Sequence, residues 1–190
     1  MSRWVFLGMP GAGKGTQAAL LAAYAGLPHV STGVMFRSAV KEGTPAGREA
    51  KKHLDSGQLV PDEVVLRMVE ERLSADDCRQ GFLLDGYPRN LSQAEALTDV
   101  LGRIDAALDG VLFFVISEAE AQRRMRARAE KEGRSDDTPE VIRERLKVYQ
   151  QQTEPLVGYY TELGLLERIQ AEGTIGQVFD RLLAVVKSGA

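Results

Sequence analysis

A glycine-rich loop near the start of the chain constrains the fold more than any other feature. Its sequence, Gly-Met-Pro-Gly-Ala-Gly-Lys-Gly-Thr, occupies residues 8–16. An apolar run typical of a buried strand precedes it at residues 3–7, and a segment typical of a helix follows at 15–25 and ends at Gly26. Glycines leave backbone N–H groups unshielded, a helix N-terminus favours anions, and Lys14 adds a positive charge. We therefore predict that this loop binds the triphosphate of a nucleotide.

The loop departs from the general phosphate-loop pattern at one position. That pattern places Ser or Thr directly after the lysine, where its hydroxyl holds Mg²⁺, but here Gly15 follows Lys14 and Thr16 comes next. We expect Thr16 to reach phosphate and Mg²⁺ to keep most of its water shell. Asp85 ends the third apolar run, and its carboxylate is the best candidate for holding the hydrated ion beside the loop.

Strands and helices alternate along the rest of the chain. The apolar runs that predict further strands lie at 28–30, 82–84, 111–116 and 165–169. The segments that predict helices in the first half lie near 32–42 and 46–56 and after Pro61-Asp62. The runs at 82–84 and 111–116 do not alternate with polar residues, as expected for strands covered on both faces. This order predicts an α/β fold, a doubly wound parallel five-stranded sheet whose ligands bind beyond the carboxyl ends of the strands.

Three positions carry signals for the start of a helix. Ser92 with Glu95 and Thr174 with Gln177 have the spacing of a capping box, and Thr138-Pro139 supplies an N-cap followed by proline. We therefore expect a helix to begin at each of them.

Composition and charge exclude several classes of function. The net charge of −3 does not attract nucleic acid over a broad surface. A single cysteine, Cys78, forms neither an internal disulfide nor a multi-cysteine zinc site. The apolar run at 111–116 is six residues long, whereas a membrane-spanning helix needs about 20. We expect a cytoplasmic protein that binds neither nucleic acid nor membranes and carries no structural zinc.

Four groups of residues, in this order and over nearly the whole chain, carry a resemblance to a known family. They are residues 8–17, Ser31-Thr32-Gly33 with Arg37, Asp85-Gly86-Tyr87-Pro88-Arg89 with Gln93, and the segment 133–137 (Gly-Arg-Ser-Asp-Asp) with Arg145. Together they resemble the nucleoside monophosphate kinases, and most closely the adenylate kinases.

The resemblance implies a phosphotransferase of the P-loop NTPase type that converts ATP and AMP reversibly into two ADP with Mg²⁺. It implies one kinase domain, 1–190, with a core formed by 1–30, 61–126 and 138–190. Residues 31–60 would be a helical AMP-binding flap and 127–137 a short lid, which lacks the length and cysteines for a zinc knuckle. A monomer is expected.

The resemblance also implies roles for individual residues. Those expected to contact ATP are Gly11, Ala12, Gly13, Lys14, Gly15, Thr16, Arg124, Arg128 and Gly173. Those expected to contact AMP are Thr32, Arg37, Gln58, Leu59, Val60, Gly86, Tyr87, Pro88, Arg89, Gln93, Arg134 and Arg145. Those expected to act in catalysis are Lys14, Asp85, Arg89, Arg128, Arg134 and Arg145, with Asp85 on Mg²⁺ through water.

Arg124 and Arg128 stand four residues apart, on one face of a predicted helix. Like charges at this spacing cost an isolated helix a few tenths of a kcal/mol, about 0.2–0.5, and an anion between them reverses the sign. The neighbouring Arg123 and Arg126 have two interpretations. They could also face the phosphates, or they could lie on a solvated helix face where glutamates balance their charge.

Two of the residues that would contact the monophosphate favour AMP as the substrate. Gln93 follows Arg89 at the spacing where adenylate kinases read adenine, and Thr32 is the adenylate-type residue; the Ser92 box would leave the Gln93 side chain free to face the flap. Val34 is a departure, because the family usually has aspartate there. The alternatives are a kinase of UMP, CMP or GMP, and a nucleotide-dependent switch, although the chain lacks the Asn-Lys-x-Asp motif that reads guanine.

Overall fold

The computed structural model describes residues 2–132 and 138–188, with Glu132 described by its backbone only. Its centre is a five-stranded parallel sheet in the order β2-β3-β1-β4-β5. The strands are β1 (Ser2–Leu7), β2 (His29–Ser31), β3 (Gly81–Asp85), β4 (Gly110–Val115) and β5 (Leu166–Gln170). The first strand lies in the middle and the chain winds outward in both directions from it, so the predicted doubly wound sheet is confirmed.

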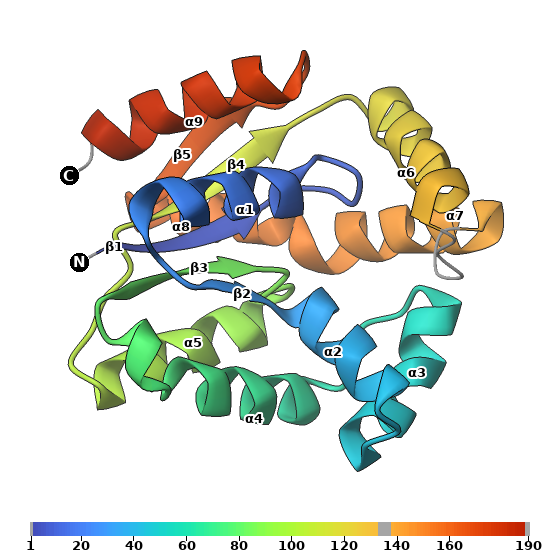
Figure 1. Ribbon diagram of the computed structural model, residues 1–190, viewed down its shortest axis with the longest axis horizontal. Coiled ribbons are helices and arrows are strands. Elements are labelled where there is room, and N and C mark those ends of the chain that lie inside the picture. Colours follow the sequence, from blue (N-terminus) through green and yellow to red (C-terminus); the bar gives the residue numbers. More distant parts are fainter. Residues whose placement is uncertain (1, 133–137, 189–190) are drawn as a thin grey trace.

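Helices cover both faces of this sheet (Figure 1). The helices of the core are α1 (Lys14–Ala25), α4 (Asp62–Leu73), α5 (Leu91–Arg103), α8 (Pro155–Glu162) and α9 (Ile175–Ser188). Trp4 and Phe6 of β1 pack in a cluster with residues of α1 and α9, whereas Val5 and Leu7 pack with residues of α4, α5 and α8. Because successive strand residues point to opposite faces, one short strand contributes to two cores and has to be apolar throughout.

Two pairs of helices extend from one end of the sheet, on the right in Figure 1. One pair is α2 (Thr32–Lys41) and α3 (Pro45–Ser56), and the other is α6 (Glu118–Glu132) and α7 (Pro139–Val148). The turn after α3 touches α7, where Gln58 Nε2 donates a hydrogen bond to Glu144 Oε1 over 2.7 Å. Gly57 has φ +74° there, and a Cβ on it would lie 3.1 Å from the Val141 carbonyl oxygen. Glycine is therefore needed where the chain leaves α3.

Shorter elements join these parts. A 3₁₀ turn, η1 (Asp76–Cys78), precedes β3, and a π-helical turn, η3 (Tyr149–Thr153), joins α7 to α8. The predicted elements all form, with β2 and β5 one residue later and β4 one residue earlier than the apolar runs suggested.

Two of the three expected caps are confirmed and one is wrong. Thr174 Oγ1 accepts from the Gln177 N–H and Gln177 Oε1 from the Thr174 N–H, and Thr138 Oγ1 caps Val141. At α5, however, Asn90 rather than Ser92 is the N-cap: its Oδ1 accepts from the Gln93 N–H over 2.8 Å. Asn90 has extended backbone angles and its carbonyl already accepts from Ala94, so the helix starts before Ser92.

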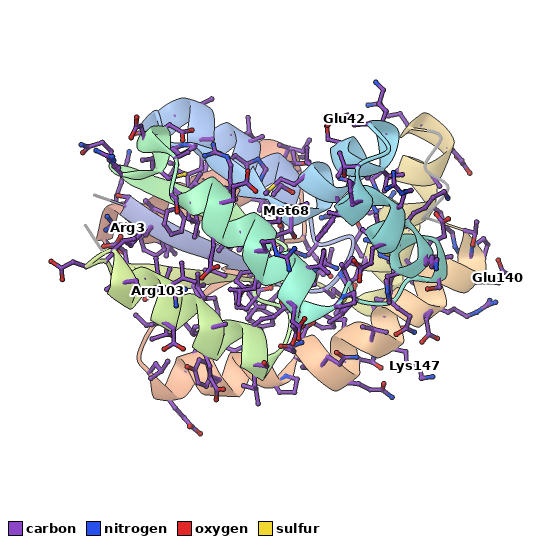
Figure 2. All side chains as sticks on the ribbon, turned by 90° about the horizontal axis from the view of Figure 1, so that it is seen from below. Arg3, Glu42, Met68, Arg103, Glu140 and Lys147 are labelled. Carbon is purple, nitrogen blue, oxygen red and sulfur yellow. The ribbon has the colours of Figure 1, made fainter. Side chains whose placement is uncertain are left out.

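Charged side chains lie at the periphery of the helices. Figure 2 shows Arg103 on α5 and Glu140 and Lys147 on α7 at the outer surface, and their side chains are 62, 73 and 62% exposed. Within residues 2–132 and 138–188, no helix combines the length and the apolar character needed to cross a bilayer.

Candidate active site

A cavity of about 920 Å³ lies at the carboxyl ends of the central strands. Its wall comes from the glycine loop, from α2 and the turn after α3, and from α6 and α7. Phe6 of β1 pairs with Asp85 of β3, so the loop that follows β1 and the segment Asp85-Gly86 meet at one edge of the sheet. The volume lies near the upper end of the range for small-molecule sites, about 300–1,000 Å³.

The glycine loop has a backbone that only glycine adopts readily. Gly11 has φ +86° and Gly13 has φ +90°. A Cβ on Gly11 would also lie 2.4 Å from the Ala121 carbonyl oxygen, so the loop packs directly against α6. Among the described residues no side chain caps the N-terminus of α1. The first N–H groups of that helix therefore face the cavity without a side-chain acceptor, as an anion site requires.

Lys14 lies at the centre of the cavity's positive charge. Its Nζ donates to the carbonyl oxygens of Gly8 over 2.6 Å and Met9 over 3.0 Å. The pKa of Lys14 is lowered to about 8, mainly by burial; the positive charges of Arg89, Arg145 and Arg128 add to the lowering and Asp85 opposes it. Asp85 is the carboxylate beside this group of cations, and the phosphates of a nucleotide would add further negative charge there.

Asp85 is the buried carboxylate at this edge, 9% exposed. Its Oδ2 accepts from Ser31 Oγ over 3.4 Å and lies 3.7 Å from His29 Nε2. Burial raises the pKa of Asp85, but the neighbouring His29 and the charge of Lys14 outweigh it, so the pKa lies below its usual value. A Cβ on Gly15 would lie 3.4 Å from Oδ2. The position that carries a hydroxyl in the general loop pattern thus faces this carboxylate.

Arg124 of α6 lies against the glycine loop. Its Nε donates to Glu120 Oε1 over 2.7 Å and its Nη2 to the Ala171 carbonyl over 3.0 Å. A Cβ on Gly13 would lie 3.7 Å from Arg124 Nη1. The basic side chains that line the cavity are those of Lys14, Arg37, Arg89, Arg123, Arg124, Arg128, Lys131 and Arg145, against carboxylates at Asp85 and Glu120. This local excess of positive charge suits a polyanionic ligand, although the whole chain is acidic.

Arg89 has its backbone held from two sides. Its N–H donates to Gln93 Oε1 over 2.8 Å, and its carbonyl accepts from Thr153 Oγ1 over 2.7 Å. Its side-chain Nε donates to the Gly86 carbonyl over 2.7 Å. Thr153 belongs to the π-helical turn, an element that is frequent at functional sites.

Most residues expected from the sequence line the cavity. They are Gly11, Ala12, Gly13, Lys14, Gly15, Thr16, Arg37, Leu59, Asp85, Gly86, Pro88, Arg89, Arg124, Arg128, Arg145 and Gly173. The described residues outside its lining are Thr32, Gln58, Val60, Tyr87 and Gln93. Arg134 lies outside the described residues. Thr32 is buried and its Oγ1 donates to the Gly86 carbonyl over 2.9 Å, so it supports the wall from behind.

The expectation of a free Gln93 side chain is wrong. The side chain belongs to a residue only 2% exposed, and its amide bonds both the Arg89 N–H and Asp62 Oδ1. The wrong cap is part of the reason, because a helix that starts at Leu91 turns Gln93 toward the core.

Sequence reasoning missed His29 and Thr153, which both line the cavity. His29 could have been found, since it stands two residues before Ser31 on the same strand and alternate strand residues share a face. Nothing local marks Thr153, because its partner is 64 positions away.

The chain is similar to known proteins over nearly its whole length. The model of the adenylate kinase family matches residues 6–165. The chain is 51% identical to an adenylate kinase of Thermobifida fusca over 99% of its own length and 100% of the relative's. It is 52% identical to one of Corynebacterium aurimucosum, with 95% and 97% covered, and 49% identical to one of Mycolicibacterium smegmatis, with 97% and 98% covered.

The chain belongs to the adenylate kinase family. It is therefore a phosphotransferase, and the kinases of other nucleoside monophosphates are the less favoured alternative. Within the part of the chain that the structure describes, no three side chains of His, Cys, Asp or Glu gather into a metal-ligating group.

Proposed function

We propose that this adenylate kinase family member binds ATP and AMP in the one cavity and transfers the γ-phosphoryl group between them, giving two ADP in a reversible, Mg²⁺-dependent reaction. The observation that carries the proposal is the convergence of cations between the glycine loop and the flap. Arg89, Arg128 and Arg145 come from three separate segments, yet the charge of each lowers the pKa of Lys14. Such a cluster suits a polyanionic ligand.

The two substrates would approach from opposite ends of the cavity. ATP would lie along the glycine loop and Arg124, with its base toward Gly173. AMP would lie toward Arg37, Leu59 and Arg89. We assign residues 31–60 to the AMP flap and 127–137 to the lid, of which 133–137, with Arg134, lie beyond the described ranges.

The residues at the sheet edge fit a hydrated Mg²⁺ ion. Mg²⁺ usually keeps several waters and is held by one or two carboxylates together with substrate phosphates. Asp85 is one buried carboxylate, ionised because its pKa is low, and it lines the cavity beside Lys14. When bound, the ion would neutralise charge on the phosphates of ATP. Asp85 would hold its water shell.

The chain's own residues would align the reactants and stabilise charge. Phosphoryl transfer needs little covalent help from protein, because the requirements are alignment, neutralisation of charge and exclusion of water. The N–H groups of the loop and Lys14 would hold the donor's phosphates. Arg89, fixed at its N–H and its carbonyl, would present its guanidinium to the acceptor phosphate at a constant position.

A coupled assay with ATP, Mg²⁺ and a panel of monophosphates tests this proposal. We expect AMP to be the preferred acceptor and Arg89→Ala to lower kcat by orders of magnitude, as loss of a group that stabilises transition-state charge does. Arg103→Ala is the matched control, because Arg103 pairs with Glu70 on the outer surface. Rates with UMP equal to those with AMP would refute the substrate assignment.

Binding separates recognition from turnover. A bisubstrate mimic that joins two adenosines through five phosphates should bind one molecule per chain in calorimetry. Absence of binding heat in a folded sample would contradict the shared cavity.

A further inference from the structure

Glu120, in the first turn of α6, holds two arginines that follow it on the same helix. Its Oε1 accepts from Arg124 Nε and from Arg123 Nη2, each over 2.7 Å, and its Oε2 accepts from Arg123 Nε over 2.6 Å. These hydrogen bonds lower the pKa of Glu120 to about 2, so the carboxylate is ionised at neutral pH. Glu120 also lines the cavity, where most charged side chains are cations. An anion at this place weakens the attraction for phosphates, so its contacts have to explain what it contributes.

The guanidinium of Arg124 is held at its edges by two separate acceptors. Nε donates to Glu120, and Nη2 donates to the Ala171 carbonyl over 3.0 Å. The N–H groups of a guanidinium lie in its plane, so two such hydrogen bonds fix the direction in which its faces point. The Arg124 side chain lines the cavity and is 24% exposed. With these edges bonded, a face of the group is its means of contact with a flat ligand.

Ala171 is an acceptor that the fold holds firmly. It is fully buried, and its N–H donates to the Val115 carbonyl over 2.8 Å. Arg181 Nη1 donates to the carbonyl oxygens of the residues on both sides of it, over 2.7 Å each. One hydrogen bond to a fixed point still allows the guanidinium of Arg124 to turn about that bond. The second hydrogen bond, from Glu120, removes this freedom.

We propose that Glu120 is a positioning residue for the donor nucleotide: it holds the Arg124 guanidinium in the orientation in which a face meets the base of ATP. The inference rests on the proposed function, in which ATP lies along the glycine loop and Arg124. Arginine stacks on flat π systems through its face. Stacking on a mobile arginine costs the freedom of that side chain, and Glu120 removes this freedom before ATP arrives. The benefit goes to the base of the donor and not to its phosphates.

Tripolyphosphate separates the two contributions, because it has the phosphate chain of ATP without the nucleoside. In the coupled assay with Mg²⁺ and saturating AMP, it and a non-hydrolysable ATP analogue should both inhibit competitively against ATP. We define the nucleoside factor as the inhibition constant of tripolyphosphate divided by that of the analogue. An unfolded fraction of a variant does not change this factor, because both constants come from the same active enzyme.

We expect Glu120→Ala to lower the nucleoside factor about two- to tenfold, which is the cost of immobilising one long side chain. The inhibition constant of tripolyphosphate should stay the same or fall, since a negative charge is removed. Glu118→Ala is the matched control. It removes a carboxylate from the same first turn of α6, but Glu118 is exposed and accepts from Gln122 rather than from Arg124, so the factor should equal that of wild type.

Arg124→Ala separates this inference from the proposed function. It should lower the nucleoside factor at least as far as Glu120→Ala does, and the double variant should fall no further than Arg124→Ala. A factor lowered by Arg124→Ala but unchanged by Glu120→Ala would overturn the role of Glu120. A factor unchanged by Arg124→Ala would overturn the contact between Arg124 and the base, and the inference with it. Turnover of ATP and AMP by the wild type tests the proposed function independently of either result.

A purely electrostatic role for Glu120 predicts a different pattern. Loss of a repelling charge would lower both inhibition constants equally and leave the nucleoside factor unchanged, which would overturn the inference. Glu120→Gln keeps an acceptor for Arg124 Nε without the charge, so its factor should lie nearer to wild type than that of Glu120→Ala. Equal factors for these two variants would overturn a role through this hydrogen bond.

Discussion

The protonation of Lys14 should make the stability of the ligand-free protein rise with pH. Folding lowers the pKa of this ammonium group from 10.5 to about 8, first through burial and then through the nearby arginines. Between these two values the unfolded chain binds a proton that the folded chain has lost. Because the unfolded state then holds more protons, the free energy of unfolding increases as the pH rises through this window.

The size of the effect follows from the two pKa values. Proton linkage gives a gain of about 2 kcal/mol in unfolding free energy between pH values of about 7 and about 9.5. Above about pH 10 the sign reverses, because burial raises the pKa of Tyr149 to about 12 and that of Tyr160 still further, so the unfolded chain releases those protons first. Within the window of about pH 7 to 9.5, burial also raises the pKa of the Cys78 thiol, which opposes the effect of the lysine, and comparison with a variant at Lys14 removes that contribution.

Denaturant unfolding across this window, in wild type and in Lys14→Met, measures the effect. The wild type should gain stability relative to the variant as the pH rises, and the variant should be the more stable protein near pH 7. Lys51→Met, which removes an exposed lysine paired with Asp55 on α3, is the control and should keep the wild-type slope. A non-hydrolysable ATP analogue should flatten the slope, since its phosphates add negative charge beside Lys14 and raise its pKa.

Equal slopes for wild type and Lys14→Met would refute this reasoning. Burial of the group would then have to be relieved by water that reaches Nζ in the folded protein.

Three further predictions follow from single contacts. Gly11→Ala should destabilise the fold by about 2–4 kcal/mol in thermal or denaturant unfolding. The φ of +86° disfavours a side chain, and the new Cβ would meet a carbonyl of α6. A loss below about 0.5 kcal/mol would mean that α6 moves freely. Asn90→Ala should cost about 1 kcal/mol as a lost N-cap, whereas Ser92→Ala should stay within about 0.5 kcal/mol, and the reverse order would restore the capping box at Ser92. Thr153→Val removes the hydrogen bond to the Arg89 carbonyl and should raise the KM for AMP up to about tenfold. A KM equal to that of wild type would show that Arg89 keeps its position without this hydrogen bond.

The local sequence determined much of this protein. The glycine loop, the strand before it and the helix after it are consecutive, so their chemistry can be read from one stretch of residues 2–25. The order of apolar runs and helices predicted the doubly wound sheet, because a crossover between parallel strands has one favoured hand. The caps at Thr138 and Thr174 could also be predicted, since each depends on residues three positions apart.

The same reasoning gave the wrong N-cap for α5, because two residues close together both have the character of an N-cap. Ser92 has the spacing of a capping box, but Asn90 stands two residues earlier and caps as well. Spacing alone does not rank two good caps. The choice depends on where the preceding chain leaves the sheet in extended conformation, which is a property of the packed molecule.

Only the tertiary structure decided the hydrogen-bond partners of the Gln93 side chain and of the Arg89 backbone. Asp62 and Thr153 reach these two residues from 31 and 64 positions away, and neither carries a local pattern that names its partner. The charge that lowers the pKa of Lys14 likewise comes from arginines that are far apart in the chain. Hydrogen bonds and Coulomb interactions act through space within a few ångströms, so sequence predicts them where the partners are neighbours in the chain, and folding determines them everywhere else.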